Sequence, residues 1–351
     1  MNSSSDTSPT SCEADLVLGK RLQHPSSLSV AFFIFLIIVN LLTFPVTAVL
    51  NALVMISVQT KSRLRGHKSN VLLAFLALTD FTIGILVQPA FAAVLIMLLL
   101  HEPRGYCVLK VLRHVTFVVN ASLFHLVLLT GERYIAMKHP FSYLTFVTEG
   151  RLLFASAMAW FLSISHSVLL LLSQPVFFIC VTISSTLSFA VISFCHVTVF
   201  GETRRHERQL AAQQVTLEAR EEFERNKKAF KLTSIILVLL ILFVLIPTGT
   251  LSVVLFSYRE FTPEAVYLFF SFTMSLVFLD SLLNPIVYAL RLRQFRVAII
   301  ELLFRTVNTV DAEEIEMRFF GGPNAVVRVN RVKDKHDQEE QNQQNMTVEN
   351  V

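Results

Sequence analysis

Long apolar segments alternate with polar segments along the chain. The apolar segments have approximate limits of 29–58, 70–98, 106–131, 152–172, 176–200, 231–257 and 264–289. A bilayer core of about 30 Å requires about 20 apolar residues in each spanning helix, and every one of these segments reaches that length. The pattern therefore predicts an all-α membrane protein that folds as a seven-transmembrane helix bundle.

The polar connections between these segments fall into two classes that differ in charge. Three connections are short and poor in lysine and arginine: HEPRG, SQP and YREFTPE. The remaining ones are rich in basic residues: KSRLRGHKSN, KHPFSYLTFVTEGR, the segment from Gly201 to Lys231, and RLRQFR after the last span. Basic loops stay on the cytoplasmic side of a membrane. We therefore expect a multi-pass protein of the plasma membrane with an extracellular amino terminus.

The composition supports this class of protein. Hydrophobic residues make up 53% of the chain and charged residues 16%, whereas soluble domains average about 45–50% and about 25%. The formal net charge of +4 comes from loop lysines and arginines that face anionic lipid. Membrane lipids are thus an expected partner, and the charge gives no reason to expect nucleic acid.

Six short motifs occur in order, each in a different apolar segment. They are Asn51, LALTD ending at Asp80, ERY at 132–134, Trp160, Pro247, and NPIVY from Asn284 to Tyr288. Together they resemble the rhodopsin-like (class A) G-protein-coupled receptors, from about residue 28 to 305. The resemblance implies that the chain transmits the binding of an extracellular ligand to a heterotrimeric G-protein, with arrestin as a further candidate partner.

The resemblance and the hydropathy pattern together divide the chain into three parts. Residues 1–28 are expected to be an extracellular amino-terminal segment, with Asn2 in a glycosylation sequence. Residues 29–305 form the receptor domain, in which the amphipathic stretch RQFRVAIIELLFR resembles the short eighth helix of the family. Residues 306–351 are polar and charged, which predicts a disordered cytoplasmic tail. No apolar stretch precedes residue 28, so the first span is expected to act as the signal anchor.

The segment GERYIAMKHPFSY is expected to couple the receptor to its G-protein. Arg133 lies at the cytoplasmic membrane boundary, and Glu132 can pair with it through a charge-assisted hydrogen bond. In the resembled family this arginine turns inward on activation and contacts the G-protein. The full set of expected coupling and activation residues is Glu132, Arg133, Tyr134, Pro140, Phe141, Tyr143, Pro247, Asn284, Pro285 and Tyr288. The alternative for Arg133 is a charge that only reaches water at a helix end.

Asp80 lies in the middle of a span, where an ionised side chain is costly and usually functional. In the resembled receptors this aspartate binds a sodium ion, and Ser122 and Asn284 fit the places of its neighbours. Asn51 and Asp280 complete a predicted polar core, which is the only metal or cofactor site that we expect. Two nearby carboxyl groups would bind a cation more tightly or share one proton. The alternative is a protonated Asp280 with a structural role alone.

The resemblance also bears on the ligand. Amine receptors have an aspartate on the third span where this chain has Val115, and opsins have a lysine where this chain has Phe278. Amines and retinal are therefore disfavoured, and a lipid-like, small neutral or peptide ligand is left open. The predicted pocket consists of Val115, Thr116, Val119, Asn120, Leu245, Thr248, Met274 and Phe278. The same residues would also suit the plain interior of a helix bundle.

Cysteine positions depart from the family pattern. The family commonly joins the outer end of the third span to a long second extracellular loop by a disulfide, but SQP leaves no room for such a loop. Cys107 is at the expected place on the third span, and its candidate partners are Cys12 and Cys180. Topology permits Cys12 because both residues are expected on the oxidising side.

A transporter or channel that uses Asp80 and Asp280 as an ion relay is the alternative function. Transporters often contain inverted repeats and paired broken spans, which this sequence lacks. The histidines in the spans have no partners at ligand spacing, and no catalytic residues are predicted. We therefore do not expect an enzyme.

Overall fold

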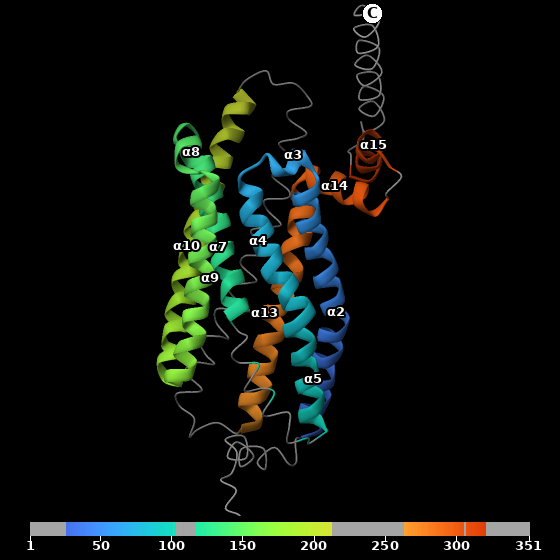
Figure 1. The fold of residues 1–351 in the computed structure, drawn as a ribbon, viewed down its shortest axis with the longest axis vertical. Coiled ribbons are helices and arrows are strands. Elements are labelled where there is room, and N and C mark those ends of the chain that lie inside the picture. Colours follow the sequence, from blue (N-terminus) through green and yellow to red (C-terminus); the bar gives the residue numbers. More distant parts are fainter. Residues whose placement is uncertain are drawn as a thin grey trace, which may run out of the picture.

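The computed structural model describes residues 26–100, 102, 108, 112, 117–212, 263–304 and 307–320. Within these ranges the regular elements are all helical, and the long helices run side by side (Figure 1). Five segments among them are long and apolar enough to cross a membrane: Ser27–Thr60, Ser69–Leu99, Glu149–Leu172, Ile179–Glu202 and Tyr267–Ala289. The predicted sixth span and the first part of the third lie outside the described residues. The predicted helical-bundle class is confirmed.

The long elements agree closely with the apolar segments of the sequence. They are α2 (Ser27–Thr60), α4 (Ser69–Thr82), η2 (Ile83–Val87), α5 (Gln88–Leu99), α7 (Phe117–Lys138), α9 (Glu149–Leu172), α10 (Gln174–Ala212) and α13 (Pro263–Arg291). The segments α4, η2 and α5 together make the second predicted span. Helix α10 continues past Gly201 into the charged connection, as its helix-forming residues predict.

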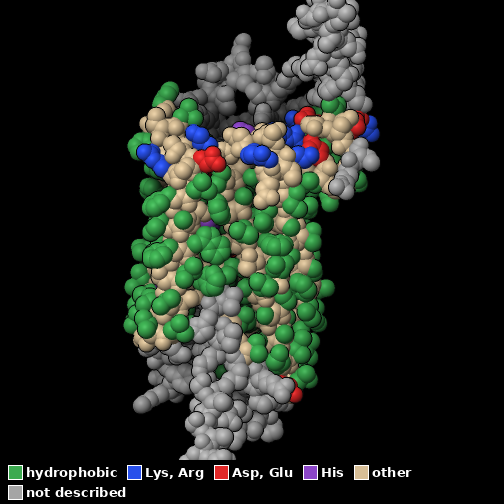
Figure 2. Space-filling view, in the orientation of Figure 1, with side chains coloured by type: hydrophobic (Ala, Val, Ile, Leu, Met, Phe, Trp, Pro, Cys, Tyr) green, Lys and Arg blue, Asp and Glu red, His purple; other side chains and the backbone are tan. Residues whose placement is uncertain are grey.

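Shorter helices lie together at one end of the bundle (Figure 1). They are α3 (Ser62–Arg65), α8 (Pro140–Phe146), α14 (Arg293–Leu303) and α15 (Thr309–Phe320). Figure 2 shows lysine, arginine and acidic side chains gathered at this end, above a wall that is mostly hydrophobic. By the positive-inside bias we expect this end to be cytoplasmic, and we name the two ends of the bundle cytoplasmic and extracellular on that expectation. The helix α14 coincides with the predicted amphipathic eighth helix.

The packing places α2 and α7 at the centre of two groups of helices. Helix α2 contacts α4, α5 and α13, and α7 contacts α4, α9 and α10. One apolar cluster in the extracellular half includes Phe33, Phe91 and Phe278. A second cluster near the cytoplasmic end includes Leu76 and also Phe295 of α14, which fixes the eighth helix to the bundle. These contacts position the polar residues that lie between the two clusters.

The second span contains a π-helical segment. The N–H of Gln88 bonds to the carbonyl of Ile83, five residues earlier, in η2. Pro89 follows directly and lacks an N–H to donate to the carbonyl four residues before it, which interrupts the α-helical ladder. Gly84 lies within η2, where a Cβ atom would come within 2.8 Å of the backbone nitrogen of Ala48 on α2. The close approach of the two helices therefore requires glycine.

The structure corrects the prediction of a disordered tail for residues 309–320, which form α15. Asn308 accepts the N–H of Asp311 through its side-chain oxygen at 2.8 Å and so caps the first turn. Ala312, Glu316 and Met317 are buried, and α15 contacts α14. The charged composition suggested disorder because the partners of these charges lie on another helix. Residues 321–351 lie outside the described part of the chain.

Candidate functional site

Asp80 is fully buried and joins three helices. Its Oδ1 accepts a hydrogen bond from Ser122 Oγ of α7 at 2.7 Å, and its Oδ2 accepts one from Asn284 Nδ2 of α13 at 2.8 Å. Burial of a carboxyl group is costly unless it is hydrogen-bonded, and both oxygens have a donor here. The sequence-predicted residues Asp80, Ser122 and Asn284 are thus brought together.

Asn51 compensates for the proline of the seventh span. Pro285 has no N–H, so the carbonyl of Ser281, four residues earlier on α13, loses its normal intrahelical donor. Asn51 Nδ2 of α2 donates to that carbonyl at 3.0 Å and to the carbonyl of Thr47 at 2.9 Å. Neighbouring groups must satisfy a proline break inside a membrane. Asn51 therefore belongs to the polar core by bonding α13 rather than Asp80 itself.

Two oxygens of the polar core are buried without a hydrogen-bond partner in the described residues, namely Asn51 Oδ1 and Asp280 Oδ1. Asp280 lies one helical turn before Asn284 on α13, and Asn284 donates to Asp80. Carboxylate and amide oxygens are the ligands that hard cations prefer. The oxygens present are therefore of the type that would hold the sodium ion that the sequence predicts.

Glu132 organises the cytoplasmic end of α7. Its Oε1 accepts a hydrogen bond from the hydroxyl of Tyr143 on α8 at 2.5 Å, and its Oε2 lies 3.5 Å from Nε of Arg133. The Glu132 side chain is only 2% exposed, while that of Arg133 is 35% exposed. Burial, the hydrogen bond to Glu132 and its negative charge together raise the pKa of Tyr143 to about 12. The tyrosine is therefore a stable donor at physiological pH.

The surface around this pair combines charge with exposed apolar groups. The side chain of Phe141 on α8 is 97% exposed, and Pro140 begins the same helix. Tyr134 packs against Phe194 of α10, with ring centroids 5.9 Å apart. Lys138 pairs with Glu202 at 2.5 Å, which ties the end of α7 to α10. An exposed aromatic residue on a charged face is typical of a contact surface for another protein.

The structure describes some of the remaining predicted residues and leaves others outside its described ranges. Tyr288 packs against the cytoplasmic apolar cluster. In the predicted ligand pocket, Phe278 is buried edge to face against Phe91, with centroids 5.4 Å apart, and Val119 and Met274 pack against the same cluster. These three side chains are therefore part of the core in this structure. The residues that lie outside the described part of the chain are Asn2, Cys12, Cys107, Val115, Thr116, Leu245, Pro247 and Thr248. Cys180, the other candidate disulfide partner, is a free cysteine.

Sequence reasoning missed a second buried polar cluster in the extracellular half. Asn40 Nδ2 of α2 donates to Ser275 Oγ of α13 at 2.8 Å, and Gln88 Nε2 donates to Thr43 Oγ1 at 2.6 Å. The amide side chains of Asn40 and Gln88, each within an apolar span, were the sequence signal that could have predicted this cluster. These bonds fix α2, α5 and α13 to one another.

The sequence also gave no role to His125, which is completely buried on α7. Its Nδ1 lies 2.7 Å from the carbonyl of Ala121, and its Nε2 lies 2.6 Å from Ser156 Oγ of α9. A carbonyl only accepts, so Nδ1 carries the hydrogen of that bond. The ring stacks on Phe75 and meets Trp160 edge to face.

The described residues thus form a helical membrane protein with a buried aspartate that joins three helices and an acid–arginine pair at the cytoplasmic end. The model of the family "7 transmembrane receptor (rhodopsin family)" matches residues 50–177 and 172–288, which is more than half of the chain. The chain belongs to this family. The family is one of receptors and not of enzymes, and membership of it does not favour the alternative of a transporter.

Curated relatives agree over a shorter stretch. The chain is 30% identical to the 5-hydroxytryptamine receptor 2C of Homo sapiens over 119 residues, covering 34% of this chain and 26% of that protein. It is 32% identical to the trace amine-associated receptor 9 of Homo sapiens over 117 residues, covering 33% of each. A third relative, the trace amine-associated receptor 7f of Mus musculus, is 34% identical over 116 residues, covering 33% of this chain and 32% of that protein. The chain thus spans between 26% and 33% of the length of these relatives.

Proposed function

We propose that this chain is a plasma-membrane receptor that transmits the binding of an extracellular ligand to a heterotrimeric G-protein. The observation that carries the proposal is the arrangement around Glu132, which binds Tyr143 and Arg133 at the cytoplasmic end of α7. Family membership supports the same role. The basic charge at this end favours the cytoplasmic side for it and an extracellular amino terminus.

The geometry supports a two-state mechanism. In the arrangement described here, Glu132 has both partners and Arg133 points its charge at its own neighbour in sequence. A G-protein that binds Arg133 would compete with Glu132 for the guanidinium group and thereby favour a second arrangement of the helices. The exposed ring of Phe141 is suited to pack into an apolar hollow on the same partner. Arrestin is a further candidate for this surface.

The test of the coupling role is Arg133→Ala in cells with a G-protein-dissociation readout. We expect signalling to be lost while surface expression is retained, because Arg133 is remote from the extracellular side. Arg65→Ala is the matched control, since Arg65 is an exposed basic residue of α3 at the same end of the bundle. Equal G-protein activation by Arg133→Ala and wild type, at equal expression, would overturn the proposed coupling.

We propose a lipid-like or small neutral ligand. The support is the valine at position 115, which stands where amine receptors of the family have an anchoring aspartate. The names of the relatives suggest the competing class, because they refer to 5-hydroxytryptamine and trace amines. A screen should therefore contain lipids, neutral molecules, peptides and these amines in separate arms. Activation by the amines alone would contradict the proposed ligand class and leave the receptor role intact.

A further inference from the structure

The tail helix α15 is attached to α14 by a buried ion pair. Glu316 Oε1 accepts hydrogen bonds from Arg296 Nε at 2.9 Å and Arg296 Nη2 at 2.6 Å. The side chain of Arg296 is 5% exposed, and that of Glu316 is 1% exposed. A buried charge requires its partner, because removal of one member leaves the other uncompensated. The attachment of α15 therefore depends on this pair more than on any exposed charge of the tail.

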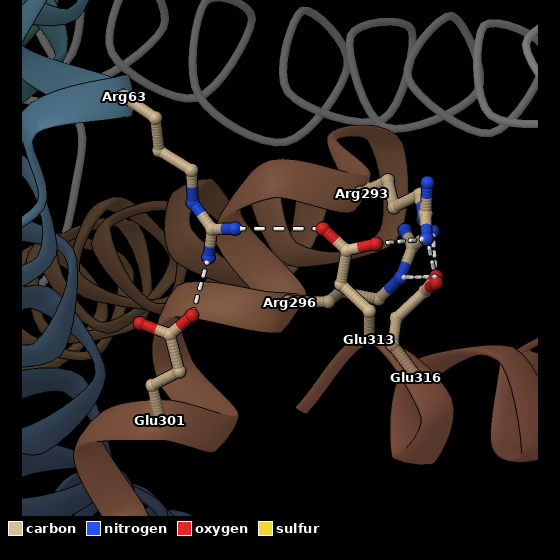
Figure 3. Close-up of polar contacts among 6 residues, drawn as sticks. All are labelled: Arg63, Arg293, Arg296, Glu301, Glu313 and Glu316. Atoms are coloured by element: carbon tan, nitrogen blue, oxygen red, sulfur yellow. Dashed lines mark hydrogen bonds and ion pairs between the residues drawn. The ribbon is translucent and has the colours of Figure 1, made fainter. Parts of the chain in front are cut away.

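Further ion pairs surround it, as Figure 3 shows. Arg293 donates to Glu316 at 3.0 Å and to Glu313 at 3.1 Å. Arg63 of α3 lies 3.8 Å from Glu313 and donates to Glu301 of α14 at 3.0 Å. We call these six residues the cytoplasmic ion-pair cluster: Arg63, Arg293, Arg296, Glu301, Glu313 and Glu316. The cluster links the first intracellular turn, the eighth helix and the tail helix.

Arg296 also contacts the seventh span. Its Nη1 donates to the carbonyl of Ala289 at 2.9 Å. Ala289 lies in the last turn of α13, where backbone carbonyls lack intrahelical donors and a nearby cation is favourable. The same guanidinium group is therefore shared between the end of α13 and Glu316 of α15. The predicted activation residue Tyr288 directly precedes Ala289, and Pro285 lies about one helical turn earlier.

We infer that α15 restrains the cytoplasmic end of α13. Glu316 fixes the orientation of Arg296, and Arg296 in turn caps α13 at Ala289. Detachment of α15 would leave the Arg296 guanidinium without its buried counter-charge, so the guanidinium would move toward water and release the end of α13. The expected effect on signalling rests on the proposed G-protein function. The restraint itself is a property of the fold and is tested separately.

Hydrogen–deuterium exchange of the full-length receptor in lipid nanodiscs tests the restraint. Glu316→Gln removes the charge and keeps the size, and Ala312→Arg separates α15 from α14 by bulk, because Ala312 is fully buried. In both variants we expect amide exchange to rise about tenfold in residues 309–320 and severalfold in residues 288–292. Arg318→Gln is the control, since Arg318 is 70% exposed and pairs within α15 with Glu314. Its exchange in residues 288–292 should equal that of wild type.

The inference is overturned if α15 exchanges faster in these variants while residues 288–292 exchange as in wild type. Unchanged exchange of both segments in both variants overturns it as well, because α15 would then not be held by this pair. Basal G-protein signalling at equal expression is the second measurement. We expect a severalfold rise for Glu316→Gln and Ala312→Arg, and none for Arg318→Gln.

The two measurements separate this inference from the proposed function. Loosened residues 288–292 with unchanged basal signalling, in a receptor that Arg133→Ala silences, would show that α15 does not restrain activation. A receptor whose output is insensitive to Arg133→Ala would contradict the G-protein role. In that case the exchange experiment alone decides whether α15 restrains α13.

Discussion

Glu132 has two partners that compensate for its burial in different ways. Tyr143 supplies a neutral hydroxyl donor from α8, and Arg133 supplies a charge from the same helix. The hydroxyl stays at Glu132 when Arg133 moves, so the carboxylate keeps one hydrogen bond in either arrangement of the arginine. A short helix in the loop after α7 thus lowers the cost of releasing Arg133.

The titration of Tyr143 is a prediction at this scale. Its pKa of about 12 means that the hydroxyl keeps its hydrogen well above the range of an ordinary tyrosine. At pH 11 about nine-tenths of an ordinary tyrosine with a pKa of about 10 is ionised, but only about one-tenth of Tyr143. The stabilising bond is complete below about pH 10 and is lost as the pH rises through about 12, since the folded pKa is the raised one.

An ultraviolet difference titration of wild type against Tyr143→Phe measures this pKa. The difference spectrum at pH 11 should contain little tyrosinate. A full tyrosinate signal at that pH would show that Tyr143 does not donate to Glu132.

At the scale of elements, irregular positions in two helices are matched by the neighbouring helix α2. Pro285 leaves the Ser281 carbonyl of α13 without its intrahelical donor, and Asn51 of α2 replaces that donor. Gly84 removes a side chain from η2 so that α2 can approach. The hydrogen bond from Asn51 and the close approach at Gly84 both fix α2 against its neighbours. Each contact can be tested by a matched pair of substitutions.

The link between Asn51 and Pro285 predicts a coupling between two mutations. Asn51→Leu leaves the buried Ser281 carbonyl without a donor and should destabilise the receptor by about 1–3 kcal/mol. In a Pro285→Ala background residue 285 regains its N–H and can bond that carbonyl itself. The same Asn51→Leu change should then cost clearly less, as measured by thermal unfolding in a double-mutant cycle. Strictly additive effects would contradict the compensation.

Gly84 and Gly150 form a second matched pair. A Cβ at Gly84 would lie 2.8 Å from a backbone nitrogen of Ala48, whereas a Cβ at Gly150 would meet nothing within 4 Å. Gly84→Ala should therefore destabilise the receptor by about 1–3 kcal/mol through overpacking. Gly150→Ala should be neutral or slightly stabilising, because alanine is favoured over glycine in a helix by about 0.5–1 kcal/mol. Equal unfolding temperatures of the two variants would show that α2 and η2 can separate at no cost.

At the scale of the whole molecule, the polar core connects helices that belong to opposite sides of the bundle. Asp80 contacts α7 and α13, while Asn51 adds α2, so a change at any one helix alters the bonds of the others. Asp280 adds a second carboxyl group one helical turn before Asn284 on α13. A cation or a proton at this place would favour one arrangement of all these helices.

Either sodium or pH should therefore change agonist affinity in wild type. If a cation joins Asp80 and Asp280, sodium should weaken agonist binding; if a proton joins them, the binding should depend on pH instead. Asp280→Asn removes the second carboxyl group and should reduce either dependence. Agonist binding would be measured against both variables in the two proteins. A wild-type receptor that is insensitive to both would leave Asp280 as a structural acid only.

Sequence patterns predicted the spans that the structure describes, but few of the contacts between them. A span is a local property of about 20 apolar residues, and its limits follow from composition. The contact between Asn40 and Ser275 joins residues 235 positions apart and depends on how α2 and α13 are rotated. Helix α15 was missed because Glu316 stabilises it through Arg293 and Arg296, which lie on α14. Contacts of this kind depend on tertiary packing, which one sequence does not display.

The π-helical segment η2 has an evolutionary consequence. It holds one residue more than a regular α-helical path would, which rotates everything after it by about 100° relative to Asp80. Deleting one residue there would restore a regular helix and turn Gln88 away from Thr43, while the bonds of Asp80 stayed in place. A length change of a single residue inside this span can therefore redirect its extracellular half without disturbing its cytoplasmic half. The two halves of one helix are free to diverge separately, and an alignment with a relative that lacks the segment needs a gap within the membrane.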